Sequence, residues 1–501
     1  MDGSGSGKSA SYSIPNAYQC LGSYVFTDPK GELYDRTAGY LKEKGYEIKV
    51  LNLVRPQYSD GYNPLMHISS ELDIDVIAST IIKGQKAEGG GADPFWDDSA
   101  EMLLKALIYY LLAARPEEEQ NLASCAELVR AANAKQGSNL LSQLMSELPY
   151  DHPARMYYKS IEIAPEKTYS SILSTLQSKL GKFDSKDIAE LTSTDTIDFE
   201  TIGNKRTAVY VISSDTHTAY DFLLTIFFSQ MIQQLYDYAD QNGGALKEQT
   251  FFILDEFANI GKIPDFDKKI STSRSRKISF SVILQNVDQL EAVYEKSYET
   301  IMGNCDTHLF LGSNSYKTVE YFSKQLGEIT ISRDNVSINK DKQNMRTGKS
   351  LSDQIMARAL MTPDELRRMD MDKCIIFVKG LKPVKTDKFY YFKHPMAKTL
   401  KSMEISHNDI GEIDRGKWRK YNPYNPYVEE EDIEKQAEEL KVESLDDIFN
   451  DQEDNQEIKV EAENKHSKIR MEESLKVPKD DYDLQKEIEA KFDELFGTSD
   501  E

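Results

Sequence analysis

The feature of this sequence that most constrains its fold is the recurrence of short apolar runs between segments of helical character. Several runs are apolar on both faces, a pattern typical of strands that helices cover on each side. The pattern therefore predicts an α/β fold built around a parallel sheet. The predicted strands are residues 23–27, 47–54, 207–213, 250–254, 278–284, 307–311 and 374–378.

Between the second and third predicted strands lie roughly 150 residues, and residues 93–186 look almost wholly helical. Apolar positions follow helical spacing in residues 100–114 and 168–180. Because so long an excursion does not fit a simple connection, it predicts a separate all-α domain over residues 93–195. The glycine-rich residues 88–92 read either as the hinge into it or as a plain surface loop.

Residues 250–264, TFFILDEFANIGKIP, contain a predicted strand that ends in two adjacent acids. Four apolar residues lead to Asp255 and Glu256, which is the Walker B pattern of a P-loop ATPase. In such a site the first acid helps to hold Mg²⁺, and the second polarises the water that attacks the γ-phosphate. An ordinary buried strand with a solvated end gives the same pattern, so a second motif is needed.

The second motif lies at the N-terminus, where the end of a Walker A loop is formed by Gly3, Ser4, Gly5, Ser6, Gly7, Lys8 and Ser9. Glycines allow backbone N–H groups to converge on phosphate, Lys8 would reach the β- and γ-phosphates, and Ser9 would ligate Mg²⁺. Asp2 stands where the full pattern has glycine, and no strand precedes the loop. A flexible tail is the alternative, but we expect a chain truncated within its own Walker A motif.

Composition limits the other classes of function. Residues 429–501 carry 27 acidic and 10 basic side chains, so most of the net charge of −23 belongs to this tail, and a nucleic-acid partner is not excluded. The four cysteines form no CxxC pair and the seven histidines lack ligand spacing, so neither a disulfide framework nor a zinc site is expected. The longest apolar stretch, residues 106–114, is too short to span a bilayer.

Three further stretches, together with GSGKS and LDEFANIGKIPDF, carry a resemblance to a known family. They are FTDPKGELYDR at residues 26–36, SRKISFSVILQNVDQL at 275–290 and MTPDELRRMDMDK at 361–373. In this order and spacing, the chain resembles the type IV coupling proteins, the TraG-like ATPases of conjugation and type IV secretion. The resemblance covers roughly residues 3–395.

The resemblance implies a RecA-like motor domain that binds ATP and Mg²⁺, formed by residues 1–92 and 196–395, with the all-α domain inserted and an acidic, largely disordered tail at residues 396–501. It also implies a homo-hexameric ring that moves single-stranded DNA with its attached relaxase into the channel proteins of a type IV secretion system. Family members are anchored in the bacterial plasma membrane by N-terminal helices and face the cytoplasm, whereas this chain carries no such helix.

Matched residue by residue, Lys8 and Ser9 are the Walker A pair and Asp255 and Glu256 the Walker B pair. Gln285 ends the strand after Walker B, where it would sense the γ-phosphate, or it is merely a polar strand end. Arg274 and Arg276 precede that strand and are both candidates for an arginine finger acting across a subunit boundary, or surface residues.

For the other matched residues, a functional and a purely structural role both stay open. Asp28 and Lys30 lie at another strand end near the expected nucleotide, or form a local ion pair that fixes a turn. Lys262, Lys268 and Lys269 either contact DNA phosphates in a pore or form a charged helix face.

Two alternative functions stay open. The first is a docking platform that recruits relaxase and, because of its broken P-loop, does not hydrolyse ATP. The second is a related ring-shaped DNA translocase of chromosome segregation.

Overall fold

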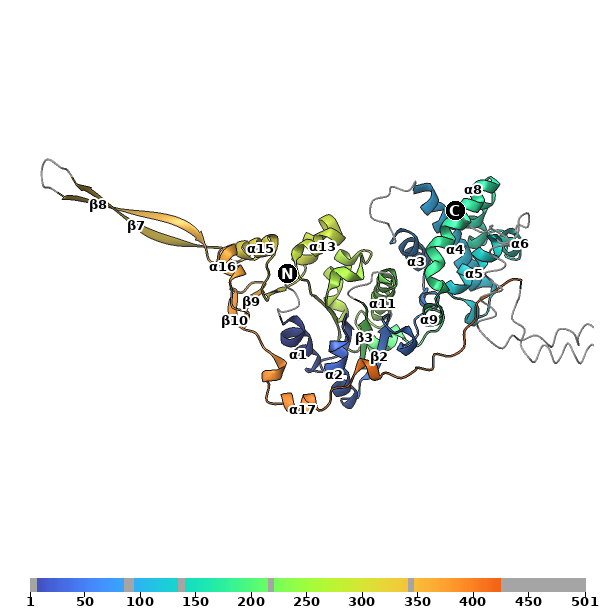
Figure 1. The fold of residues 1–501 in the computed structure, drawn as a ribbon, viewed down its shortest axis with the longest axis horizontal. Coiled ribbons are helices and arrows are strands. Elements are labelled where there is room, and N and C mark those ends of the chain that lie inside the picture. Colours follow the sequence, from blue (N-terminus) through green and yellow to red (C-terminus); the bar gives the residue numbers. More distant parts are fainter. Residues whose placement is uncertain (1–6, 85–93, 134–139, 215–219, 341–346, 425–501) are drawn as a thin grey trace, which may run out of the picture. The chain divides into compact units, whose positions relative to one another are not determined.

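The fold is described from a computed structural model, which places residues 7–84, 94–133, 140–214, 220–340 and 347–424 (Figure 1). All seven predicted strands form. Five of them build a parallel sheet with the order β2-β3-β1-β4-β5. These strands are β1 (Ser23–Thr27), β2 (Glu47–Asn52), β3 (Thr207–Ile212), β4 (Thr250–Leu254) and β5 (Ile278–Val282).

The central strands are buried on both faces, as their apolar sequences require. Every residue of β1 and β3 is buried, and successive side chains of β1 point into different hydrophobic clusters. Tyr24 and Phe26 pack on one face with Tyr210 and with helices α1 (Ile14–Ala17) and α2 (Glu32–Glu43). Val25 points to the other face, which α3 (Glu71–Lys83) and α11 (Asp221–Gln241) cover.

The region between β2 and β3 is helical, as predicted. The hydrophobic cluster on the face of Val25 continues without a break into this region, which shares it with the sheet. Its helices, together called here the helical insertion, are α4 (Pro94–Ala114), α5 (Leu122–Asn133), α6 (Leu140–Ser146), α7 (Pro153–Glu162), α8 (Glu166–Leu180) and α9 (Lys186–Leu191). The 88–92 hinge prediction falls outside the described residues.

The placement of the last two predicted strands in the parallel sheet is wrong. β6 (Thr307–Phe310) and β9 (Lys373–Val378) pair antiparallel with each other, and β10 (Val384–Asp387) completes a second, three-stranded sheet. Between β6 and β9 along the chain lies an antiparallel hairpin, which was not predicted. Its strands are β7 (Glu328–Lys340) and β8 (Thr347–Ala359). Its strands are polar and lack the apolar run on which the prediction relied.

Shorter helices connect these strands and follow the second sheet. They are α10 (Phe199–Asn204), α12 (Phe266–Thr272), α13 (Val287–Tyr294), α14 (Tyr298–Gly303), α15 (Tyr316–Leu326), α16 (Pro363–Arg367) and α17 (Ala397–Lys401). The chain then runs with little regular structure to residue 424. Of the predicted tail, residues 396–501, the structure describes residues 396–424, and the part from residue 425 onward lies outside the described residues. None of the helices described is both long enough and apolar enough to cross a bilayer.

Candidate nucleotide site

The two acids after β4 and the lysine of the N-terminal motif lie together at the carboxyl edge of the parallel sheet. Lys8 Nζ is 2.7 Å from Glu256 Oε1 and 3.7 Å from Asp255 Oδ1. Lys8 and Glu256 are 248 positions apart in the sequence. The side chains of Lys8, Asp255 and Glu256 are each at most 18% exposed. The structure therefore brings the two predicted motifs into one site.

The turn after β4 holds both acids in place. Glu256 adopts a left-handed backbone conformation, with φ of 50° and ψ of 47°, and its N–H donates to Asp255 Oδ1 at 3.0 Å. The hydroxyl of Thr27, at the end of β1, donates to the carbonyl oxygen of Asp255 at 2.7 Å. Phe257 N–H donates to the carbonyl of Ile283 after β5. Both neighbouring strands therefore fix this turn.

Gln285 completes the site from the strand next to β4. It follows β5, and its Nε2 donates to Glu256 Oε1 at 2.9 Å, the same oxygen that Lys8 contacts. Helix α13 starts two residues later with a capping box between Asn286 and Gln289. The side chain of Gln289 also accepts a bond from the backbone N–H of Gln285, which fixes the strand end.

Burial and charge oppose each other at Asp255. Removal from water raises the pKa of its carboxyl, and the neighbouring ammonium of Lys8 lowers it again. The cation of Lys8 therefore helps to keep Asp255 ionised, which is the form that binds a metal ion.

Both the backbone conformation and the packing at position 7 favour glycine. Gly7 adopts a φ of +73°, and a Cβ there would lie 3.0 Å from the ring of Tyr390. Ser9 begins the π-helical turn η1 (Ser9–Ser13) directly after Lys8. Gly3, Gly5 and Ser6, the other predicted phosphate-binding residues, lie outside the described residues.

The fit to a nucleotide with Mg²⁺ rests on the chemistry of these donors. Within the placed residues, no cluster of three or more His, Cys, Asp or Glu side chains could hold a metal ion unaided. Proteins usually bind Mg²⁺ through one or two carboxylates together with phosphate oxygens and water, and Asp255 offers such a carboxylate beside Lys8.

The two candidate arginines occupy different environments before β5, at the amino edge of the sheet. Arg276 is held in place, because its guanidinium pairs with Asp240 at 2.9 Å and lies 4.8 Å from the ring centre of Tyr236. Arg274 is 94% exposed and approaches Asp306 only to 4.0 Å. The structure brings neither arginine to Lys8 or Glu256, and it leaves the side chain of Arg274 exposed to solvent.

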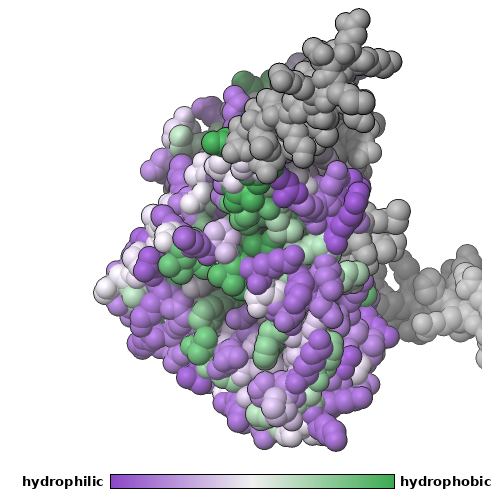
Figure 2. All heavy atoms as spheres, turned by 90° about the vertical axis from the view of Figure 1, so that its left-hand side faces the viewer, coloured by the Kyte–Doolittle hydropathy of each residue, from purple (hydrophilic) through white to green (hydrophobic). Residues whose placement is uncertain are grey.

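A groove of about 790 Å³ runs along β5 and connects these regions. The groove lies between β5 and β6. Residues that line it include Lys8, Tyr12, Gln285 and Arg274. The hydroxyls of Tyr12 and Ser281 lie 2.7 Å apart across it. On the face at the hairpin end of the molecule, hydrophobic side chains gather in a hollow bordered by hydrophilic ones (Figure 2).

Asp28 has a structural partner that the sequence did not reveal. It is 2% exposed, and its Oδ2 accepts a bond of 2.8 Å from the backbone N–H of Tyr34 in the first turn of α2. Burial raises the pKa of Asp28 to about 7. Of the three lysines after Walker B, Lys268 forms an ion pair with Asp265, and burial lowers the pKa of Lys269.

Two aromatic residues of the site escaped the sequence analysis. Tyr12 and Tyr390 carry no motif signal, and only the fold brings Tyr390 against Gly7, 383 positions away along the chain.

Comparison with known proteins agrees with this geometry. Among curated proteins, the chain is 25% identical over 417 residues to the probable conjugal transfer protein TraG of Sinorhizobium fredii, covering 81% of this chain and 63% of the relative. It is 23% identical over 420 residues to protein VirD4 of Agrobacterium fabrum, covering 80% and 59%. The chain thus spans about three fifths of the length of these relatives.

A solved structure has the same fold. The bacterial conjugative coupling protein TrwB, in a trigonal form with sulphate, superposes with a TM-score of 0.55 at 17% identity, covering 77% of this chain and 83% of that one. This confirms the predicted α/β P-loop ATPase fold with an all-α insertion. The family described as type IV secretory system conjugative DNA transfer matches residues 1–412. The chain therefore belongs to this family of conjugative DNA-transfer coupling proteins.

Proposed function

We propose that this chain binds ATP with Mg²⁺ and couples its hydrolysis to the transfer of single-stranded DNA, with its attached relaxase, into a type IV secretion channel. One observation carries the proposal. Lys8, Glu256 and Gln285 come from three separate segments and meet at a single carboxylate oxygen. A P-loop ATPase needs these three residue types beside the γ-phosphate.

Each side chain has a role in this proposal. Lys8 exchanges its bond to Glu256 for one to the β- and γ-phosphates, which leaves the Glu256 carboxylate to accept a proton from the attacking water. Ser9 and Asp255 hold Mg²⁺, which supplies charge neutralisation at the phosphates. Gln285 reports the presence of the γ-phosphate because its amide can donate either to phosphate or to Glu256.

Arg274 is the better candidate for the arginine finger. It is exposed, and its ion-pair partner among the described residues, Asp306, is 4.0 Å away, whereas Arg276 is engaged within its own chain. An arginine that acts on the nucleotide of a neighbouring subunit must be exposed on the surface of its own subunit, as Arg274 is. This exposure supports a ring such as the hexamer that the resemblance implies.

The division into domains belongs to the same proposal. Residues 1–92 and 196–395 form the motor domain, residues 93–195 form the insertion that recruits the DNA-bound relaxase, and residues 396–501 engage partners. In this proposal the protein works at the cytoplasmic face of the plasma membrane.

The experiment that tests the function is ATP hydrolysis with and without single-stranded DNA. We expect the chain to hydrolyse ATP, and Lys8→Ala and Glu256→Gln each to lower the rate by about 10²-fold or more. Lys324→Ala, which removes a lysine whose side chain is 75% exposed and which no part of the proposal uses, is the matched control and should leave the rate unchanged. Unchanged turnover in the first two variants contradicts the site.

A non-hydrolysing docking platform is the second candidate, favoured by Asp2 in the Walker A pattern. It predicts relaxase binding without nucleotide turnover. If the unaltered chain neither binds nor hydrolyses ATP, the platform replaces the motor as the proposed function.

A further inference from the structure

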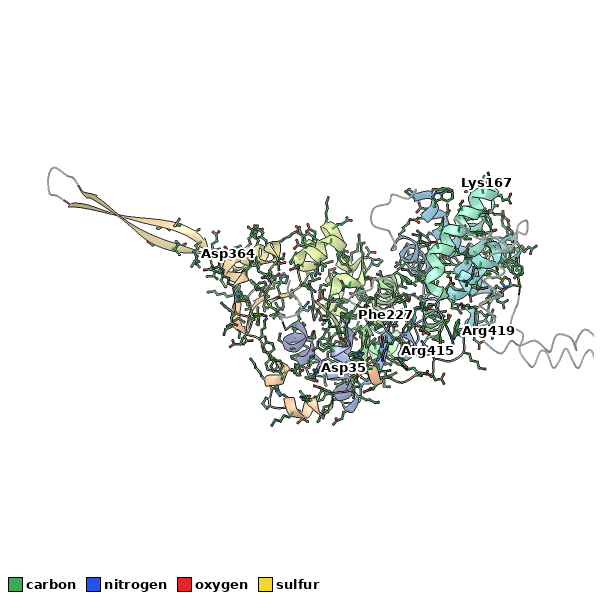
Figure 3. All side chains as sticks on the ribbon, viewed as in Figure 1. Asp35, Lys167, Phe227, Asp364, Arg415 and Arg419 are labelled. Atoms are coloured by element: carbon green, nitrogen blue, oxygen red, sulfur yellow. The ribbon has the colours of Figure 1, made fainter. Side chains whose placement is uncertain are left out.

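The segment after the second sheet contacts both the parallel-sheet core and the helical insertion. We call residues 388–424 the C-terminal strap. It contains only the short helix α17 and two single 3₁₀ turns, so side-chain contacts rather than its own secondary structure determine its path. Asp35, Arg415 and Arg419, which make three of these contacts, are labelled in Figure 3.

The first anchor is on helix α2 of the core. The backbone N–H and the Nδ1 of His407 lie 2.5 and 2.9 Å from Asp35 Oδ1, and Glu404 pairs with Arg36 at 2.6 Å. The strap backbone also lies close to the helix, since a Cβ on Gly39 would stand 2.0 Å from the carbonyl oxygen of Met403. A glycine in the middle of a helix is thus explained by the strap above it.

The second anchor joins the core to the insertion through one side chain. Arg415 is 4% exposed at its side chain. Its Nη1 donates to the carbonyl of Pro56, just after β2, at 3.1 Å, and its Nη2 pairs with Glu190 of α9 at 2.9 Å. The planar guanidinium is suited to such a link, because its donors diverge in fixed directions.

The third anchor is on the insertion itself. Arg419 pairs with Glu119 at 2.9 Å and with Glu118 at 2.5 Å, and the carboxylate of Glu119 is 2% exposed. Arg115 binds the other oxygen of Glu119 and also lies 4.0 Å from the ring centre of Tyr421. Buried Tyr421 donates its N–H to Ser124 Oγ at 2.9 Å.

We propose that the strap fixes the orientation of the helical insertion on the core. The shared hydrophobic cluster and ion pairs such as that of Lys105 with Asp75 attach the insertion on one face of the sheet, and attachment on one face alone leaves rotation about it possible. The strap adds a second attachment that starts on the opposite face, at α2, and ends at α5 and the residues before it. Two separated attachments restrict such rotation, so release of the strap would let the insertion move.

The strap also begins at the nucleotide site. Tyr390 packs against Gly7, and Tyr391 lies edge to face with Tyr18 at a centroid distance of 6.3 Å. The anchors at Arg415, Arg419 and Tyr421 lie beyond residue 412, where the match to the family ends. The proposal does not depend on ATP hydrolysis.

The test measures the distance between spin labels at Lys42→Cys, on the exposed side of α2, and Lys167→Cys, on α8, in the full chain with Cys20 and Cys305 replaced by serine. The distance distribution is expected to be narrow for the unaltered strap. Arg415→Ala combined with Arg419→Ala should broaden it. The control is Lys417→Ala with Lys420→Ala, which removes the same charge from the strap and should leave the distribution narrow.

An unchanged narrow distribution in the double arginine variant would overturn the proposal. Since loss of Arg419 leaves the buried Glu119 with one partner fewer and could unfold the chain, Arg419→Gln with Glu119→Gln provides a second variant. It removes the charge pair with Glu119 without leaving that buried carboxylate short of a partner, whereas Glu118, which also loses Arg419, is 39% exposed and stays in contact with water. Broadening in this variant, with unchanged circular dichroism, supports the proposal, and a narrow distribution refutes it.

Discussion

The close approach of the strap to α2 can be tested with one methyl group, by Gly39→Ala. Alanine in place of a helical glycine normally raises the free energy of unfolding by about 0.5–1 kcal/mol. Here the added Cβ would meet the Met403 oxygen at 2.0 Å and Ile405 Cγ2 at 3.3 Å. The first separation is far inside van der Waals contact, so the strap must move by roughly 1 Å or more, and such overpacking costs about 1–3 kcal/mol.

We therefore expect Gly39→Ala to lower the free energy of unfolding by about 1–2 kcal/mol, although its helix propensity improves. Gly303→Ala is the matched control, because Gly303 ends helix α14, is exposed, and has no atom within 4 Å of the added Cβ. That variant should be neutral or slightly stabilised.

The assay is thermal unfolding of the full-length variants, with hydrogen exchange of residues 403–407 as a local readout. Faster exchange there in Gly39→Ala alone would show that the strap has been displaced. If Gly39→Ala is as stable as Gly303→Ala and exchanges no faster, the reasoning from the close contact is refuted.

Three further predictions concern the site and its surroundings. Arg274→Ala should reduce ATP hydrolysis without changing the melting temperature. Arg276→Ala should instead lower the free energy of unfolding by about 1 kcal/mol, because it removes an ion pair and a ring contact. Thermal unfolding measures both effects, and a loss of stability in Arg274→Ala would contradict this assignment. Glu256→Gln should bind ATP more tightly than the unaltered chain, by calorimetry, because Lys8 no longer has to leave a carboxylate; equal or weaker binding would contradict it. Burial raises the pKa of Asp28 to about 7, above its ordinary value of 3.8, so the folded chain holds a proton that the unfolded chain releases. The contribution of Asp28 to stability should therefore rise by on the order of 4 kcal/mol as the pH falls from above 7 towards 4; Asp28→Asn should lose this pH dependence of urea unfolding, and a variant that retains it would contradict the assignment.

The sequence predicted those elements whose signal is local. Every predicted strand exists, and its bounds differ from the structure by at most two residues, because an apolar run between helical segments specifies a buried strand directly. The convergence of Asp255, Glu256 and Gln285 was also predictable, because residues that follow parallel strands meet at one edge of the sheet. Lys8 follows no strand in this chain, and only its P-loop motif predicted that it would join them.

The missed features depend on contacts between distant parts of the chain. Nothing in residues 307–311 says that this strand pairs antiparallel with β9 rather than joining the parallel sheet, since pairing partners are not encoded in a strand's own hydropathy. Likewise, Arg274 and Arg276 are indistinguishable in sequence. Only the fold brings Asp240 and Tyr236 to the second of them.

The position of β5 at the rim of the parallel sheet has a consequence for the behaviour of the chain in solution. Within the described residues β4 is its only strand partner, and no charged side chain interrupts residues 278–284. Phe280 and Val282 are half-buried there, in a strand that has no proline. This unpaired edge lines the groove between β5 and β6, and an unpaired edge is a template for the addition of a strand from another chain. The isolated chain should therefore aggregate through β5 as its concentration rises, and agents that occupy this edge should keep it monodisperse.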